Sequence, residues 1–256
     1  AGSVGLESGI VLSSGLISDS IGPNEDTSTS GYSDTEGDPD LDELSGATTY
    51  DAAVMSFEFV PDAARIAIRY VFGSEEYNEY VGSPYNDSFA FFVNGTNCAV
   101  VPGTEDPVTI NTINHGNEDA EVPPSNPGYF RNNDEPDDDG EYPLNTEMDG
   151  LTTVLTCTAD VTPHETNTMK LAIADASDDA FDSHVFLGEG SLTTCVEDGL
   201  ETLQGTPLEG SASRAVHDGI EPLVEAVNPT LGSVVHDVNC SVVAPTEDQV
   251  DALVRG

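Results

Sequence analysis

The sequence has very few basic residues. Only six of its 256 residues are lysine or arginine, against 48 aspartates and glutamates, and the formal net charge is −42. Nucleic acids and anionic membranes are bound by basic surfaces, so this composition argues against both as partners. Repulsion between so many like charges destabilises a compact chain unless salt screens it. We therefore expect a protein from a halophilic organism.

The hallmarks of membrane proteins and of common enzymes are also missing. No apolar run is long enough to cross a membrane, and the chain begins at Ala1 without a signal-type segment, so we expect a processed chain with no membrane insertion. There is no G-x-S-x-G element, no H-E-x-x-H spacing among the five histidines, and no glycine-rich phosphate loop before a helix. We expect no enzyme activity. The enzyme alternative is a secreted glycoside hydrolase using Glu75 and Glu76 with Asp175, although no tryptophan is present to stack on a sugar.

The four cysteines favour disulfides over a metal site. None of them stands in C-x-x-C spacing, and three N-x-S/T sequons occur in the same chain, which together indicate an extracellular location at the cell surface. Three connectivities are possible, and we favour Cys98 with Cys157, both in strand-like segments, and Cys195 with Cys240. The glycosylation candidates are Asn86, Asn94 and Asn239.

Short strands separated by turn residues make up most of the chain. In "RIAIRYVF" the apolar residues Ile66, Ile68, Tyr70 and Phe72 alternate with others, which is the period of a half-buried strand. "SFAFFV" is a short apolar run typical of a strand buried on both sides. Further predicted strands are "SVGLESGIVLSSG", "VMSFEFV", "PVTI", "TVLTCTA", "TMKLAIAD" and "HVFL". The pattern predicts an all-β fold, an antiparallel β-sandwich of jelly-roll type.

The chain divides into a sandwich and an extension. We assign residues 1–191 to the sandwich, with a long polar insertion between Asn111 and Asn145. Residues 192–256 form a small C-terminal appendage, for which interrupted apolar periodicity predicts short, broken helices. Within it, "NCSVVAP" is a possible strand.

Two acidic loops follow or precede the most apolar strands. Calcium takes six to eight oxygen ligands, and these loops offer carboxylates and amides next to core strands, where uncompensated charge is costly. In so acidic a chain, however, such runs also occur as solvated surface. We predict a Ca²⁺ site that draws on Glu75, Glu76, Asn86, Asp87, Asp175, Asp178 and Asp182. His184, beside them, is expected to be a packed histidine rather than a ligand.

Several segments together resemble a known family. "YVFGSEEYNEYVGSPYNDSFAFFVNG", "YDAAVMSFEFVPDA", "NCAVVPGTEDPVTINTIN", "MDGLTTVLTCTADVTP" and "KLAIADASDDAFDSHVFLGEGS" occur in order. They are similar to the choice-of-anchor L domain, a module of secreted and cell-surface proteins of bacteria and archaea. The resemblance covers Gly5 to about Ser191 and, with the acidity, indicates a haloarchaeal source. It implies an extracellular β-rich module and no settled biochemical activity.

Among non-enzymatic functions, a structural or adhesive surface component fits these features best. The alternative is a calcium-dependent carbohydrate-binding module in which Tyr77, Tyr80 and Tyr85 stack on surface glycans, whereas the simpler interpretation has these tyrosines pack over the loop. The family resemblance also implies a further strand ahead of "SVGLESGIVLSSG", which would leave one sheet edge open here. Either the chain's own tail or a strand from a neighbouring subunit could cover it, and the second option predicts a homopolymeric filament.

The acidity gives a first testable prediction. Because the Debye length shrinks from about 10 Å at 0.1 M salt to about 3 Å at 1 M salt, repulsion should weaken and the melting temperature should rise with NaCl or KCl concentration. Circular dichroism across a salt series measures this. A melting temperature that does not depend on salt would contradict a halophilic origin.

Overall fold

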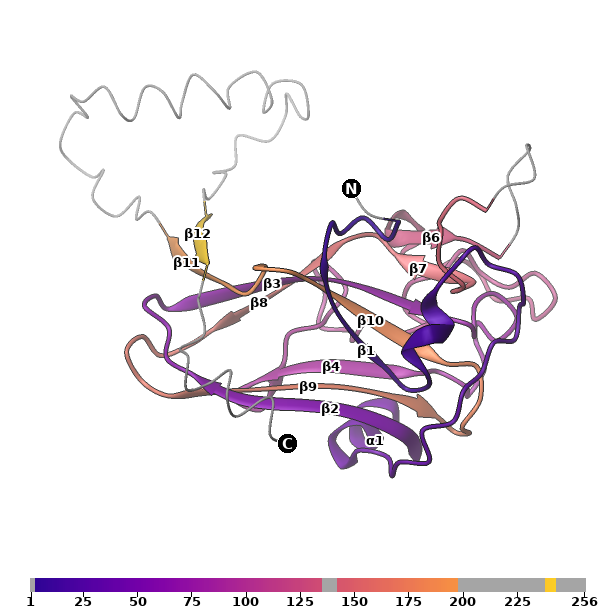
Figure 1. Ribbon diagram of the computed structural model, residues 1–256, viewed down its shortest axis with the longest axis horizontal. Helices are drawn as coiled ribbons and strands as arrows, with labels where there is room; N and C mark the ends of the chain where they lie inside the picture. Colours follow the sequence, from indigo (N-terminus) through magenta and orange to yellow (C-terminus); the bar gives the residue numbers. More distant parts are fainter. Residues whose placement is uncertain (1–2, 135–141, 198–237, 243–256) are drawn as a thin grey trace, which may run out of the picture.

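The computed structural model describes residues 3–134, 142–197 and 238–242. Its described part is an antiparallel β-sandwich of two packed sheets, as the strand pattern predicts (Figure 1). None of the helices in these ranges has the length and hydropathy needed to cross a membrane. The helices are short: η1 (Ile17–Ser20), α1 (Pro39–Ser45) and η2 (Pro127–Tyr129).

The first sheet is built around β3 (Arg65–Ser74), which pairs along both edges. One edge of β3 pairs with β10 (Ser183–Gly188) and, farther along, with β11 (Thr193–Glu197). Beyond them, β1 (Gly9–Ser13) pairs with β10, and β12 (Val238–Val242) pairs with β11. The other edge pairs with β8 (Leu155–Asp160) and with β7 (Gly150–Thr152), beside β6 (Phe130–Asn132). The predicted strand in "NCSVVAP" is therefore present as β12, which pairs with β11 on the same edge of β3 that carries β10.

The second sheet has the order β2-β9-β4-β5. These strands are β2 (Thr49–Phe59), β9 (Asn167–Ala176), β4 (Ser88–Val93) and β5 (Thr96–Asn97). The prediction of a strand at "PVTI" is wrong: Pro107 and Thr109 form only isolated bridges, to Val100 and Ser88. The predicted broken helices of the appendage lie outside the described residues.

The core lies between the sheets, and the alternation in β3 places its aromatic side chains there. The Tyr70 ring meets Phe89 and Phe91 of β4 edge-on, with centroids 5.3 and 5.0 Å apart, and Phe72 stacks on Phe89 at 5.0 Å. Such ring pairs add about 0.5–1.5 kcal/mol beyond the area they bury. The predicted disulfide between Cys98 and Cys157 is present and joins the segment after β5 to β8 in the opposite sheet.

The register of β11 and β12 bears on the second predicted disulfide. The two strands are antiparallel, with residue 195 directly opposite residue 240. Directly opposed residues in antiparallel strands have Cα atoms about 4.5–5.5 Å apart, within the range that a disulfide spans. The backbone thus suits the predicted pairing of Cys195 with Cys240, whose side chains are outside those described.

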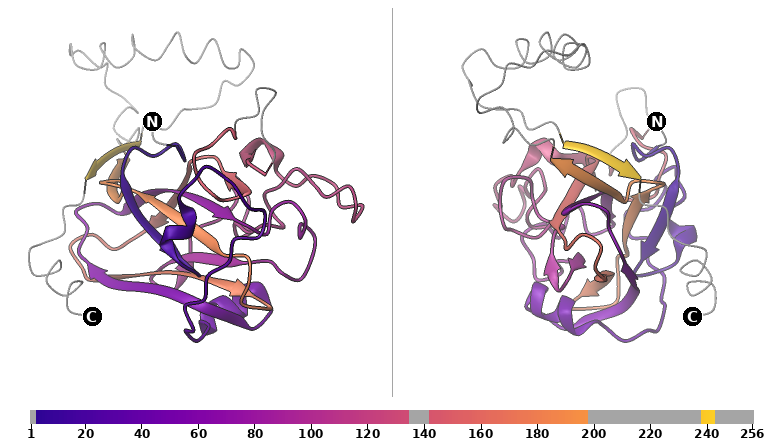
Figure 2. Two further views of the ribbon diagram at one scale, coloured as in Figure 1. Left: turned by 45° about the vertical axis from the view of Figure 1, so that its right-hand side comes forward. Right: turned by 90° about the vertical axis from the view of Figure 1, so that its left-hand side faces the viewer.

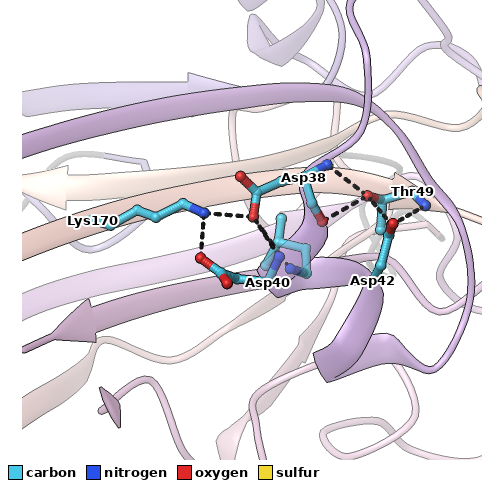
Figure 3. A network of polar contacts seen from close by, with 6 residues as sticks. Asp38, Asp40, Asp42, Thr49 and Lys170 are labelled. Atoms are coloured by element: carbon cyan, nitrogen blue, oxygen red, sulfur yellow. Dashed lines mark hydrogen bonds and ion pairs between the residues drawn. The ribbon is translucent and has the colours of Figure 1, made fainter. Parts of the chain in front are cut away.

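Helix α1 covers the outer face of the second sheet, and the chain's single lysine fastens it there (Figure 3). Alanines in β4 and β9 leave room for Leu41, which is fully buried. Asp38 caps the helix by accepting from the Asp40 and Leu41 amides. Lys170 Nζ on β9 donates to Asp38 Oδ1 and to Asp40 Oδ2, both at 2.6 Å. These carboxylates raise the pKa of Lys170, although burial opposes them.

We predict that Lys170→Gln destabilises the protein by more than its change in net charge explains. The substitution leaves two aspartates without their cation, and hydrogen bonds to charged groups contribute about 1.5–3 kcal/mol each. Arg69→Gln is the matched control, because Arg69 is exposed on β3 and its loss changes the net charge equally. Urea unfolding at one fixed high salt concentration compares the two variants. Equal losses would mean that the bridge contributes nothing specific.

Candidate functional site

Acidic loops from both sheets meet at one end of the sandwich. The register pairs the end of β3 with the start of β10, at Ser74 and Ser183, and the end of β9 with the start of β4, at Ala174 and Ser88. Figure 1 shows these ends together, where the β9 arrow terminates on the right. The residues directly after β3, before β4, at the end of β9 and before β10 therefore lie near one another. These positions hold Glu75, Glu76, Asp87, Asp175 and Asp182.

These five carboxylic acids are all buried. Asp87 is the best satisfied of them, since its Oδ1 accepts from the Ala176 amide at 3.0 Å and its Oδ2 from the Ser183 hydroxyl at 2.7 Å. Asp182 Oδ2 accepts from the Gly31 amide at 2.8 Å, while its Oδ1 has no partner. Neither oxygen of Asp175 has a hydrogen-bond partner. The Ser14 hydroxyl lies close to Asp175 and donates to the Ser183 carbonyl at 3.3 Å.

The buried acids fall into two groups, one around Glu76 and the other around Glu75. Glu76 interacts electrostatically with Asp87 and Asp178, and Asp87 with Asp175 and Asp178. Glu75 instead interacts with Asp149, Glu147 and Asp182. Glu75 and Glu76, in the bend directly after β3, therefore have different charged neighbours.

Burial, followed by repulsion between the acids, raises their pKa values. The pKa of Glu76 rises to about 10, because burial disfavours its charge and Asp87 and Asp178 repel it. That of Asp87 rises to about 7 and that of Asp182 to about 6, with burial again the main cause. Burial also raises the pKa of Asp175 well above its usual range, with Asp87 and Asp182 adding to the shift. These carboxylates are held where ionisation is costly unless a cation joins them.

In the described part of the chain, no basic side chain forms an ion pair with these acids. Lys170 pairs instead with Asp38 and Asp40, and Arg65 pairs with Asp160. Arg131 donates to the main-chain carbonyls of Val4 and Thr152. An oxygen-rich, anionic and partly unsatisfied set of ligands is the chemistry that a hard cation such as calcium requires.

These acids alone do not form a complete metal-coordination site. Within residues 3–134, 142–197 and 238–242, no three His, Cys, Asp or Glu side chains are arranged to hold a metal ion. A bound ion would therefore need small side-chain rotations, together with amide or main-chain oxygens, as is usual in the irregular coordination of calcium.

The predicted ligands differ in how well the structure places them. The structure brings Glu76, Asp87, Asp175 and Asp178 together, and Asp178 is half-buried with an unpartnered Oδ1. Glu75 faces the other group. Asn86 is half-buried, and its Oδ1 accepts from the Asn111 amide at 2.9 Å, so that oxygen is already occupied.

His184 and Tyr77 are packed rather than exposed at the site. His184 is fully buried in β10, with Nε2 3.1 Å from the Ser13 hydroxyl, and burial lowers its pKa to about 4. Tyr77 is fully buried and donates to the Ile113 carbonyl. Tyr80 packs edge-on against Tyr85 and also meets the Phe181 ring, with centroids 5.5 and 5.1 Å apart. The simpler expectation for these tyrosines, packing over the loop, is thus the one observed.

Sequence reasoning missed three polar residues in the group around Glu75. Asn24, Glu147 and Asp149 are buried there, although they come from a loop and from the segment before β7. Asp149 directly precedes a strand, as Asp87 and Asp182 do, and that position was the available signal. It was obscured because β7 has only three residues.

Two of the glycosylation candidates can be placed. Asn94 is exposed in the turn between β4 and β5, and its amide bonds reciprocally across to β9, donating to Asn167 Oδ1 and accepting from the Thr168 amide. Asn86 is half-buried beside the acidic site. The side chain of Asn239 on β12 is outside those described.

Comparison with known proteins agrees with the architecture. The family model for the choice-of-anchor L domain matches residues 1–193, which includes every strand of both sheets except β12 and most of β11. No curated protein and no solved structure matches the chain. The family is one of cell-surface and secreted modules. The chain therefore belongs to the choice-of-anchor L domain family.

Proposed function

We propose that this chain is a non-enzymatic, calcium-stabilised structural or adhesive module of the cell surface, from an organism that lives in concentrated salt. The observation that carries the proposal is the buried Asp175, with two unpartnered oxygens, among the acids Glu76, Asp87 and Asp178. Removing an ion from water costs several kcal/mol even after relaxation, so such a group needs compensation. Calcium, at the concentrations that extracellular modules use, offers it.

A structural role for the ion fits the site better than catalysis does. The carboxylates of Glu75 and Asp175 are fully buried, and neither residue lines the two large surface hollows, of about 910 and 620 Å³. A glycoside hydrolase would need its carboxylates open to a sugar. The tyrosines near the site pack on each other and on Phe181, which also disfavours a sugar platform.

The proposal predicts a double effect of Asp175→Asn. In the presence of chelator, the variant should be more stable than the wild type, because a neutral amide replaces a buried carboxylate. Calcium should then stabilise the wild type but not the variant. A ligand at 100 times its dissociation constant contributes about 2.7 kcal/mol. Melting curves at fixed high salt, with chelator, calcium or magnesium, provide the measurement.

Asp179→Asn is the matched control for this experiment. Asp179 lies in the loop directly after β9 and is exposed, so its substitution changes the net charge equally without altering a buried group. The control should keep the full calcium response. If Asp175→Asn responds to calcium as the wild type does, Asp175 does not bind the ion and the proposed site is wrong.

One feature of the sandwich supports assembly through strand donation as a second role. In the described residues, β1 and β2 each pair on one side only, and they border the same side of the sandwich. The segment around Thr35 and Glu36 bonds to the start of β2 at Asp51 and Ala52. Farther along, an apolar groove of about 620 Å³ follows the strands, lined by Ile10, Met55, Phe57, Phe59, Leu187 and Leu192 among others.

A strand from a second copy of this chain suits that groove. Extended segments commonly bind by adding to a free strand edge while their side chains fill adjacent pockets. In the described residues, the chain's own β12 pairs with β11 and not with β1. Head-to-tail pairing of this kind produces filaments unless the rotation closes a ring.

We predict that Ile10→Glu abolishes such polymers. Ile10 is 53% exposed on β1 and lines the groove, so a charge there opposes burial by a partner strand. Ile21→Glu is the control, because Ile21 is 72% exposed and does not line the groove. Negative-stain imaging and mass photometry at high salt detect the chains. A wild type that is strictly monomeric would end the proposal of a filament.

A further inference from the structure

A second group of buried oxygens lies on the other side of Glu75 from Asp175. It is formed by three separate parts of the chain: the loop that begins at Asn24, Glu75 directly after β3, and the segment from Glu147 to Asp149 before β7. Ser74 pairs with Gly150, which places Glu75 and Asp149 just past the paired ends of their strands. The loop runs past this end of the sandwich between η1 and α1 (Figure 1, Figure 2).

Hydrogen bonds from the loop to buried acids hold the loop at this end of the sandwich. The main-chain amides of Glu25 and Asp26 donate to the Glu147 carboxylate at 3.0–3.2 Å. Thr29 donates its amide to Glu75 Oε2 at 3.3 Å and its hydroxyl to Glu147 Oε1 at 3.2 Å. The Asn24 amide group donates to Asp149 Oδ1 at 2.7 Å and to the Asn133 carbonyl at 3.0 Å.

Three oxygens in this group remain without any partner. They are Asn24 Oδ1, Glu75 Oε1 and Asp149 Oδ2. Their residues are 1%, 0% and 0% exposed, so water does not satisfy them from the surface. Buried polar groups without a partner are rare in native proteins, and those that occur often bind an ion or an internal water. Here all three atoms are oxygen acceptors, and two belong to carboxylic acids that repel each other.

We propose that Asn24, Glu75 and Asp149 bind a second calcium ion, with Glu147 close by. A ligand set of carboxylates and an amide oxygen is typical of calcium, whereas magnesium demands compact octahedral geometry and retains several waters. The set contains two carboxylates and one amide oxygen, and the described residues contain no group of three His, Cys, Asp or Glu side chains arranged to hold a metal ion. The inference extends the proposed calcium binding but depends on different residues.

The second ion would fasten the loop to the sandwich. Asn24 belongs to the loop, whereas Glu75 and Asp149 belong to the ends of β3 and β7, so an ion bound by all three links the loop to the first sheet. Calcium bound to Glu75 and Asp149 would also reduce the repulsion between these two carboxylates and the neighbouring Glu147. Its binding should therefore slow hydrogen exchange at Glu25, Asp26 and Thr29.

Equilibrium dialysis of calcium at fixed high salt, with the full chain, tests the assignment. The wild type should bind two equivalents, and both Asp149→Asn and Asp175→Asn should bind one. Asp149→Asn keeps an oxygen for the Asn24 amide to donate to, and circular dichroism confirms that each variant is folded. Asp26→Asn, in the same loop but exposed, is the charge-matched control and should bind two.

Hydrogen exchange of the wild type, with calcium or chelator, adds a test that needs no variant. We expect calcium-dependent protection of the amides from residue 25 to 29, lost in Asp149→Asn and kept in Asp175→Asn. If Asp149→Asn still binds two equivalents, or if calcium does not protect these amides in the wild type, the second site is wrong. Loss of an equivalent in Asp149→Asn but none in Asp175→Asn would support the second site while overturning the first. A wild type that binds no calcium would overturn both.

Discussion

Repulsion between carboxylates is the constraint on which the rest of this structure depends. The chain has a single lysine, and that lysine bridges Asp38 and Asp40 at the outer face of the second sheet. The antiparallel register brings a set of buried acids, which includes Glu75, Glu76 and Asp175, together at one end of the sandwich. Because no described basic side chain pairs with them there, the fold at that end depends on protons or cations from the solvent.

Under the proposed function, protons and calcium would compete for these carboxylates, and the pKa shifts give the direction in which stability changes with pH. Burial raises the pKa of Glu75 to about 10 from an ordinary value near 4.5, so at intermediate pH the folded chain holds a proton that the unfolded chain releases. For such a group, folding is favoured by acid, and this contribution decreases as pH rises from the unfolded pKa toward the folded one. A bound cation would restore stability at neutral pH by taking the place of the protons. Under the proposed function, extracellular calcium would provide the positive charge that the composition of the chain does not.

The fold could be predicted from the sequence largely because successive residues of a strand point to opposite faces of the sheet, so a strand with one buried face has apolar residues at alternate positions. Ile66 to Phe72 gave both the strand β3 and its buried face, and "SFAFFV" gave a strand covered on both sides, by the core and by α1. "PVTI" also contains β-branched residues but is not paired along a ladder, and pairing is a property of the whole chain rather than of four residues.

The site was predictable only in part, for a related reason. Local sequence shows that an acid directly follows or precedes an apolar strand, and that signal found Glu76, Asp87 and Asp175. It does not show which side of the chain each carboxylate faces, so Glu75 was grouped with neighbours that it does not contact. It also does not show that Asn86 already accepts from Asn111. Partners such as Asn24, 125 residues before Asp149, become visible only when the loop is seen in place.

The way in which the chain is cross-linked follows from the same constraint. Ordinary salt bridges need basic residues that the composition does not provide, and exposed pairs contribute little in any case. The stabilisation from a disulfide does not depend on charge or salt. The Cys98–Cys157 disulfide closes a loop across 59 residues between the sheets, for which the loss of chain entropy in the unfolded state implies a stabilisation of about 4 kcal/mol. The opposed positions 195 and 240 would add a second covalent link where β11 and β12 extend the first sheet. Covalent links in the body of the sandwich and cations at its acidic end would together provide the attraction that so negative a chain cannot obtain from its own charges.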